Sequence, residues 1–133
     1  MYDIKLGNMK SGSPESGYKD IRIDRASKLG NPFDLDRNES LRDSICDAYH
    51  RYLWESIKAA NSNALQPIVL EGYGLKLADS RQAVLPADVF HSLQTINEVN
   101  RSSNVRLMCW CVRPNQDIRC HGQSIIAAVR WLW

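Results

Sequence analysis

The sequence predicts a small α/β domain, in which a mostly parallel sheet is flanked by helices in a Rossmann-like sandwich. Three observations predict this class. Segments with strand periodicity alternate with segments of helical periodicity, an order typical of parallel sheets. Residues 105–112, VRLMCWCV, form a nearly continuous apolar run, as expected of a strand buried on both faces. The chain of 133 residues is long enough for one core and short for two.

The domain is expected to begin after an N-terminal arm. Residues 7–17, GNMKSGSPESG, combine Gly, Ser and Pro without periodicity, which is typical of a loop. We therefore predict a flexible arm at residues 1–17 and a single α/β domain at residues 18–133.

The first predicted strand leads into a loop. Residues 18–25, YKDIRIDR, alternate so that Ile21 and Ile23 share one face. Residues 26–34, ASKLGNPFD, interrupt the pattern, because Gly30 permits backbone conformations that other residues avoid and the following Pro fixes its own φ.

Helical spacing appears in three later segments. Asp36 and Glu39 resemble a capping box, and apolar residues recur at helical spacing from there through residue 60. A second helix is predicted over 86–99, with Pro in its first turn, and a third over 121–133.

Two further strands are predicted between these helices. Residues 67–73, PIVLEGY, form a short apolar run between Pro and Gly residues, and 105–112 form the central strand. Residues 72–85 give no assignable pattern. In sheets of this class ligands bind beyond the carboxyl ends of the strands, where the loops after 18–25 and 105–112 are both expected.

The composition limits the classes of partner and the location that are expected. A formal net charge of +2 is too small to favour bulk binding of nucleic acid or anionic membranes. The sequence contains no apolar run of membrane-spanning length and no secretory signal. We expect a cytoplasmic protein, whose four cysteines serve as thiols or metal ligands rather than as a disulfide framework.

Residues 109–121, CWCVRPNQDIRCH, hold three of the cysteines and one histidine. Cys109 and Cys111 lie two apart on the predicted strand and share a face, and Cys120 and His121 follow at the start of the last helix. These four residues predict a closed zinc site of the Cys₃His type, although adjacent ligands diverge at a helix start.

The same segment admits two other interpretations. Cys120 at a helix N-terminus would have a lowered thiol pKa, helped by Arg113 and Arg119, with His121 as proton donor or acceptor in catalysis. Alternatively, the strand cysteines are small buried hydrophobes.

The loop RASKLGNPF is suited to an anion or a nucleotide fragment. It offers two cations, a hydroxyl, a closely approachable backbone and an amide, from Arg25, Lys28, Ser27, Gly30 and Asn31. Phe33 would pack under a ligand ring or anchor the loop to the core. Arg113, in the second loop, is the further candidate for ligand binding. A surface turn with solvated charges remains the alternative.

Two segments, IRIDRASKLGNPF and LMCWCVRPNQDIRCHG, resemble the DUF4326 family of small proteins frequent in bacteriophage and bacterial genomes. The family pattern is a strand, an Arg, a loop ending in Gly-Asn-Pro-Phe, and then a late Cys-Trp-Cys and Cys-His. The resemblance points to these positions: Arg25, Ser27, Lys28, Gly30, Asn31, Pro32, Phe33, Cys109, Trp110, Cys111, Cys120 and His121. The last third is also similar to DUF488, and neither family brings an established reaction.

The sequence departs from that pattern at four positions. Asp24 stands where Gly is usual, Ala26 where Pro is usual and Leu29 where Trp is usual. Gln123 stands where an Asp commonly follows Cys-His. Absence of that carboxylate beside the histidine favours binding over catalysis.

The leading hypothesis is that both loops face one pocket, which binds a nucleotide or a related anionic small molecule and sequesters or modifies it. If the protein is encoded by a phage, such binding would act on a nucleotide signal of the host, in the host cytoplasm. The alternatives are a nucleotide-modifying hydrolase or transferase that uses Cys120 and His121, and a metal-stabilised inhibitor of a host protein that makes contact through residues 7–17. A homodimer is expected from the aromatic residues Tyr49, Tyr52, Trp54, Trp131 and Trp133.

Overall fold

The computed structural model describes residues 2–11, 14–110 and 119–133. Its described part contains one three-stranded sheet, formed by β1 (Ile4–Asn8), β2 (Tyr18–Arg22) and β3 (Asn104–Cys109). The strand order is β1-β3-β2 and every pairing is parallel. The predicted small α/β class is therefore confirmed.

The central strand β3 is buried on both faces, as its apolar sequence predicts. Val105, Leu107 and Cys109 belong to the hydrophobic core. Arg106 and Met108 point to the other face, where Gly7 of β1 leaves room for both side chains.

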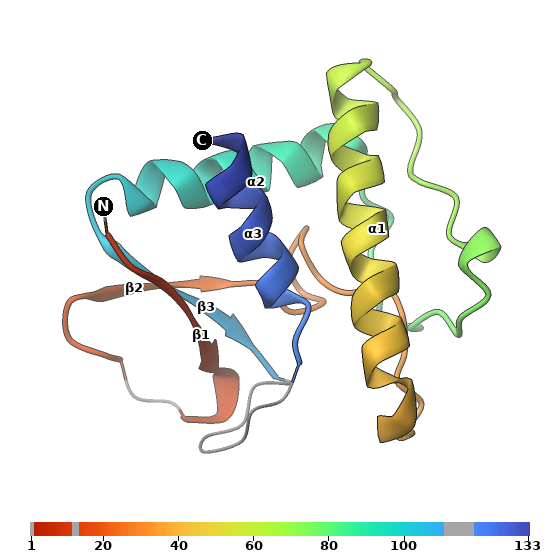
Figure 1. Ribbon diagram of the computed structural model, residues 1–133, viewed down its shortest axis with the longest axis horizontal. Helices are drawn as coiled ribbons and strands as arrows, with labels where there is room; N and C mark the ends of the chain where they lie inside the picture. Colours follow the sequence, from red (N-terminus) through yellow and green to blue (C-terminus); the bar gives the residue numbers. More distant parts are fainter. Residues whose placement is uncertain (1, 12–13, 111–118) are drawn as a thin grey trace.

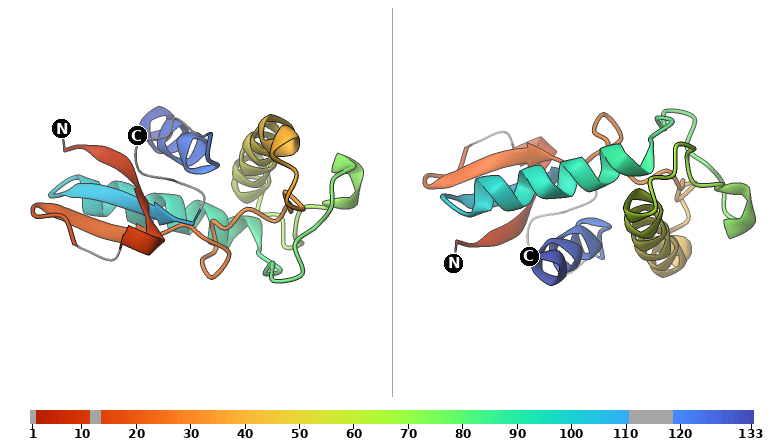
Figure 2. Two further views of the ribbon diagram at one scale, coloured as in Figure 1. Left: turned by 90° about the horizontal axis from the view of Figure 1, so that it is seen from below. Right: turned by 90° about the horizontal axis from the view of Figure 1, so that it is seen from above.

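Three α-helices cover the core: α1 (Arg42–Asn61), α2 (Pro86–Asn100) and α3 (Gly122–Leu132). Figure 1 shows α2 and α3 beside the sheet and α1 beyond the end of β2. Helix α2 packs on β3, α3 packs on β1, and α1 packs against both other helices (Figure 2). Short 3-10 turns η1 (Met9–Ser11), η2 (Glu39–Leu41) and η3 (Glu71–Tyr73) complete the regular elements. Within the described residues, no helix is long and apolar enough to cross a membrane.

The predicted arm at residues 1–17 is wrong in its first part. Ile4–Asn8 form the edge strand β1, in register with β3 from the pair Ile4 and Val105 onward. The partner strand lies about a hundred residues away, so the local sequence carries no sign of this pairing. Gly7 and Asn8 are buried in the sheet, so these two residues of the predicted contact segment 7–17 are not exposed to a partner.

The predicted strand at residues 67–73 is also wrong. Its first part, where Val69 is largely exposed, has no regular structure, and its end forms η3. The unassigned stretch that follows has a clear role, because Leu77 forms an antiparallel bridge with Phe33 of the first loop.

The first helix begins later than the capping-box pattern predicts. Asp36 has a left-handed backbone with φ of 52°, so it does not cap a helix. Asn38 does so instead, because its side chain accepts a hydrogen bond from the backbone N–H of Ser40 at the start of η2.

The aromatic residues behind the dimer prediction divide into two groups. Tyr49 and Tyr52 are buried in this chain's own core and so do not indicate a second copy. Trp131 is 74% exposed at the end of α3, where its ring meets Trp54 edge-on. The homodimer remains a prediction that rests on the exposed tryptophans.

Candidate functional site

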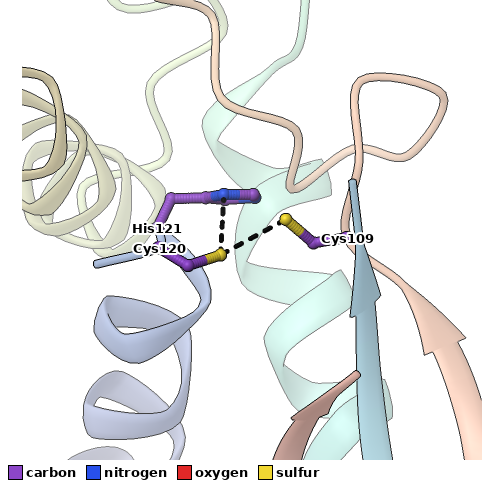
Figure 3. A group of neighbouring side chains, drawn as sticks. All are labelled: Cys109, Cys120 and His121. Carbon is purple, nitrogen blue, oxygen red and sulfur yellow. Dashed lines mark hydrogen bonds between the residues drawn. The ribbon is translucent and has the colours of Figure 1, made fainter. Parts of the chain in front are cut away.

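Two cysteines and one histidine meet between the end of β3 and the start of α3 (Figure 3). The sulfurs of Cys109 and Cys120 are 3.3 Å apart, and the Cys120 sulfur lies 3.7 Å from Nδ1 of His121. All three side chains are buried. Their ligand-type atoms all lie within 4.8 Å of one another, which makes this trio a candidate metal centre within the described part of the chain.

The hydrogen bonds of His121 define its orientation. Nε2 lies 2.7 Å from the backbone oxygen of Ile23, which can only accept, so Nε2 carries the proton. In the neutral ring Nδ1 then presents its lone pair toward the Cys120 sulfur. The imidazole and the ring of Tyr49 also pack in a T-shaped arrangement, with 4.8 Å between centroids.

Gly122 allows α3 to begin this close to the sheet. A Cβ at this position would lie 2.4 Å from a methyl carbon of Leu6 and 2.8 Å from one of Ile23. The close approach also brings the backbone N–H of Gly122 to 3.4 Å from the Cys120 sulfur. A sulfur at a helix N-terminus that accepts an N–H is placed to carry negative charge.

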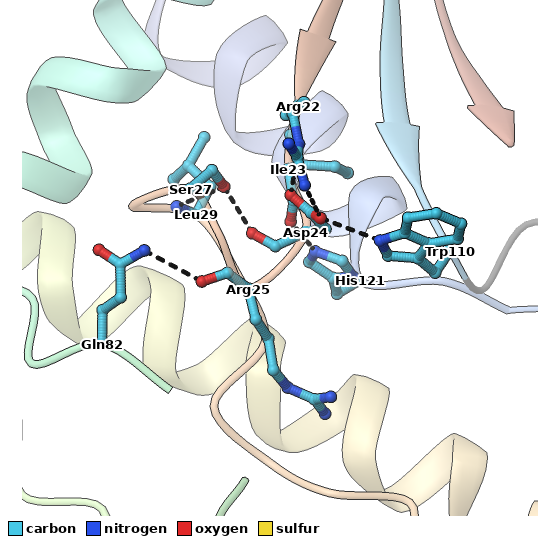
Figure 4. Close-up of polar contacts among 9 residues, drawn as sticks. All are labelled: Arg22, Ile23, Asp24, Arg25, Ser27, Leu29, Gln82, Trp110 and His121. Atoms are coloured by element: carbon cyan, nitrogen blue, oxygen red, sulfur yellow. Dashed lines mark hydrogen bonds and ion pairs between the residues drawn. The ribbon is translucent and has the colours of Figure 1, made fainter. Parts of the chain in front are cut away.

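The loop after β2 is held in shape by its own side chains. Arg25 donates from Nε to the carbonyl of Asn31 at 2.9 Å and from Nη2 to that of Phe33 at 2.8 Å. The Ser27 hydroxyl donates to the carbonyl of Asp24 at 2.8 Å (Figure 4). These two side chains therefore help to build the loop.

Neighbouring elements fix this loop to the domain. The hydroxyl of Tyr49 on α1 donates to the carbonyl of Leu29 at 2.7 Å, and Gln82 donates to the carbonyl of Arg25 at 3.0 Å. Phe33 is buried, so it anchors the loop to the core and does not offer a face to a ligand.

Asp24 is a buried carboxylate beside the Cys/His trio. It accepts bonds from the guanidinium of Arg22 and, at 3.0 Å, from the indole N–H of Trp110 (Figure 4). Its pKa is lowered from the ordinary value of 3.8, first by the hydrogen bond from Arg22 and also by that from Trp110, while burial acts in the opposite direction. The bond fixes the indole of Trp110, which is 51% exposed.

One cavity of about 460 Å³ joins the two predicted segments, and we call it the Cys/His cavity. It lies beyond the carboxyl ends of β2 and β3, the expected position for a ligand in a parallel sheet. Of the predicted residues, it brings together Arg25, Asn31, Phe33, Cys109, Cys120 and His121. Trp110 also lines it.

The other predicted ligand residues face elsewhere. Ser27 and Gly30 line a second cavity of about 440 Å³ on the far side of the loop, which Arg25 and Asn31 also border. Lys28 is exposed and lines a hollow of about 130 Å³. The predicted residues Cys111 and Arg113 lie outside the described residues.

The cavity also has walls that sequence reasoning missed. Arg42 and Cys46 of α1 and Ser80 line it, and so does Asp34. A helix-start arginine and a serine in a stretch without periodicity carry no local signal of a shared site. Their convergence depends on α1 and the 76–82 segment packing around the loop.

The cationic groups in this cavity differ in their partners. Arg42 is ion-paired with Glu39, and Arg119 with Asp43 and Asp47. Arg25 donates to two carbonyl oxygens and makes no ion pair with the described residues. Its positive charge is therefore not neutralised by a carboxylate within that part of the chain.

Comparison with protein families gives a match to the model described as Domain of unknown function (DUF4326), over residues 8–131. Neither the curated proteins nor the solved structures contain a match to this chain.

Proposed function

The chain belongs to the DUF4326 family, and we propose that it binds a nucleotide or a nucleotide-derived anionic small molecule in the Cys/His cavity. The observation that carries this proposal is the position of Arg25. Arg25 lines the same cavity as the Cys/His trio, and its guanidinium makes no ion pair among the described residues. An anionic ligand group would supply the missing countercharge.

The cavity suits a small organic anion in size. About 460 Å³ lies within the range of about 300–1,000 Å³ usual for small-molecule sites. Because the backbone carbonyls of Asn31 and Phe33 already hold the Arg25 side chain, little side-chain entropy is lost when it binds a phosphate or carboxylate.

The indole of Trp110 favours a ligand with a ring. It is half exposed at the cavity wall and fixed through its N–H by Asp24. A fixed aromatic face stacks on a nucleobase, an interaction worth about 1–3 kcal/mol per base. This distinguishes a nucleotide from inorganic phosphate, which would use the cation alone.

Isothermal titration calorimetry with purine and pyrimidine nucleotides, and with inorganic phosphate, tests this function. Arg25→Gln should weaken nucleotide binding about 10–100-fold, because a charge-assisted hydrogen bond contributes about 1.5–3 kcal/mol. Trp110→Ala should weaken nucleotides and leave any phosphate binding unchanged.

Arg81→Gln is the matched control. Arg81 also donates to a backbone carbonyl, that of Ala78 at 2.8 Å, but it lines the second cavity. Its replacement should leave the affinity unchanged. An affinity that falls with Arg81→Gln and not with Arg25→Gln would move the ligand to the second cavity and refute the proposal, as would the absence of binding by every nucleotide tested.

A second candidate function is catalysis by the Cys120 thiol. The specific observation is that its sulfur meets both the N–H of Gly122 and Nδ1 of His121 at the cavity wall. This arrangement suits a nucleophile with an adjacent base. If wild-type protein turns over a bound nucleotide and Cys120→Ala binds it without turnover, this function holds; equal turnover by the variant rules it out.

A further inference from the structure

We infer that Cys109, Cys120 and His121 bind a single Zn²⁺ ion as a three-ligand site whose fourth coordination position opens into the Cys/His cavity. The inference differs from the closed Cys₃His site predicted from sequence, because it uses three protein ligands and leaves one position for an exogenous group. The inference extends the proposed function. It rests on that function in one respect, because the ligand and the metal would share one cavity.

Two of the three distances between the ligand atoms are close to those of tetrahedral coordination, and all three lie within 4.8 Å. With Zn–S bonds of about 2.3 Å and Zn–N bonds of about 2.05 Å, tetrahedral angles place two sulfurs about 3.8 Å apart and a sulfur and a nitrogen about 3.6 Å apart. The observed separations are 3.3 Å between the sulfurs and 3.7 Å between the Cys120 sulfur and Nδ1. The third pair, the Cys109 sulfur and the His121 nitrogen, lies within 4.8 Å, so rotation of the Cys109 and His121 side chains would have to close the site around the ion.

The second nitrogen of His121 is held as zinc ligands require. A metal-bound histidine almost always donates its other ring N–H to a carboxylate or a backbone carbonyl, which fixes the ring and its tautomer. Here Nε2–H donates to the carbonyl of Ile23 at 2.7 Å, so Nδ1 is left as the ligand atom. Ile23 directly follows β2, and its own backbone N–H donates to the carbonyl of Met108 in β3 at 2.9 Å.

The chemistry of the donors favours zinc. Two thiolates would balance the charge of a divalent ion, and the imidazole binds neutral, which suits this buried position. The backbone N–H of Gly122 would add a hydrogen bond to the Cys120 thiolate. Arg119 lines the same cavity and is ion-paired with Asp43 and Asp47, so its own charge is compensated.

The fourth coordination position of the proposed ion would be open to a ligand in the Cys/His cavity. All three ligand residues border the Cys/His cavity, as do Arg25 and Trp110. Three protein ligands with one open position is the arrangement of catalytic zinc, whereas structural zinc has four. An anionic oxygen of the bound ligand would take that position, in a cavity that Arg25 also lines. Cys120 would then be a metal ligand, and the nucleophile role described above would not apply.

Cobalt substitution tests the site without any organic ligand. We expect reduced wild-type protein to bind one Co²⁺ per chain, with sulfur-to-cobalt charge-transfer bands and the visible bands of tetrahedral Co²⁺, and Zn²⁺ to displace it. Cys120→Ser and His121→Gln should lose stoichiometric binding. Cys46→Ser is the matched control, because Cys46 is a buried thiol that lines the same cavity outside the trio and should leave the spectrum unchanged.

The open position has its own measurement. Inorganic phosphate or cyanide should change the visible cobalt bands of the wild type, and Cys111→Ser should keep both the metal and this response. Loss of metal in Cys111→Ser would show a closed four-ligand site and overturn the inference. Absence of the charge-transfer bands in fully reduced wild type would also overturn the inference, whether or not nucleotides bind. If nucleotides bind to protein that takes up no metal, the metal site is wrong and the proposed function still holds.

Discussion

Substitution of Gly30 by alanine tests whether the first loop is closed on itself as the structure shows. A Cβ on Gly30 would lie 2.5 Å from the Cα of Arg25 and 2.7 Å from the backbone oxygen of Asp24. These are backbone atoms, which must move by about 0.9 Å to reach the 3.4 Å of ordinary contact. The φ of Gly30 is not positive, so crowding is the effect under test.

The expected cost follows from two opposing contributions. Overpacking costs about 1–3 kcal/mol, and replacing Gly by Ala recovers about 0.4–1 kcal/mol through the unfolded state. The net destabilisation is about 1–2 kcal/mol. An unfolding entropy of about 2.1 cal/mol/K per residue gives roughly 0.28 kcal/mol/K for this chain, so Tm should fall by about 4–7 °C.

Differential scanning calorimetry measures this effect, with Gly72→Ala as the control. Gly72 has no atom within 4 Å of its added Cβ and its φ is not positive. Its replacement should leave Tm unchanged or raise it slightly. If Gly30→Ala is as stable as wild type, or if both variants lose stability equally, the packing of the Arg25 backbone on Gly30 is wrong.

Three further changes have defined outcomes. Tyr49→Phe should cost about 1–2 kcal/mol in urea unfolding, because the buried carbonyl of Leu29 loses its donor, and an unchanged midpoint would contradict that bond. Asp24→Asn should cost about 1–3 kcal/mol at pH 7. Because the folded pKa of Asp24 is lowered, its contribution is complete above the ordinary value of 3.8 and is lost as pH falls through the lower folded value. The difference from wild type should shrink in acid unfolding, and a gap that stays constant with pH would refute this. Lys28→Ala should leave nucleotide affinity unchanged in calorimetry, since this exposed side chain faces away from the Cys/His cavity, and a clear loss would contradict that placement.

The sequence predicts the parts of the fold that local pattern decides. The apolar run of β3 and the start of α2 at Pro86 are recognisable from composition and periodicity alone. β1 is not, because Ile4–Asn8 are stabilised by pairing with a strand far away in the chain. The same holds for Leu77, whose bridge to Phe33 depends on tertiary packing.

The candidate site is predictable in its location more than in its roles. The rule that ligands bind beyond strand ends places the loop after β2 and the cysteines after β3 together, and the structure brings both onto one cavity. The sequence does not predict that Arg25 donates two hydrogen bonds to carbonyls of its own loop, or that Phe33 anchors this loop to the core. Those roles depend on which groups the folded chain brings next to each side chain.

The strand order β1-β3-β2 also has a consequence for the order of events during synthesis. Neither edge strand pairs with the other, and both depend on β3, the last strand of the described chain to leave the ribosome. At about 5–20 residues per second, the edge strands wait on the order of 5–20 s for their partner. Helices α1 and α2 can form in that interval, but the sheet cannot. Unpaired strand edges in a nascent chain promote aggregation. We therefore expect this protein to depend on chaperones until β3 is synthesised, and to become independent of them once β1 and β2 have paired with it.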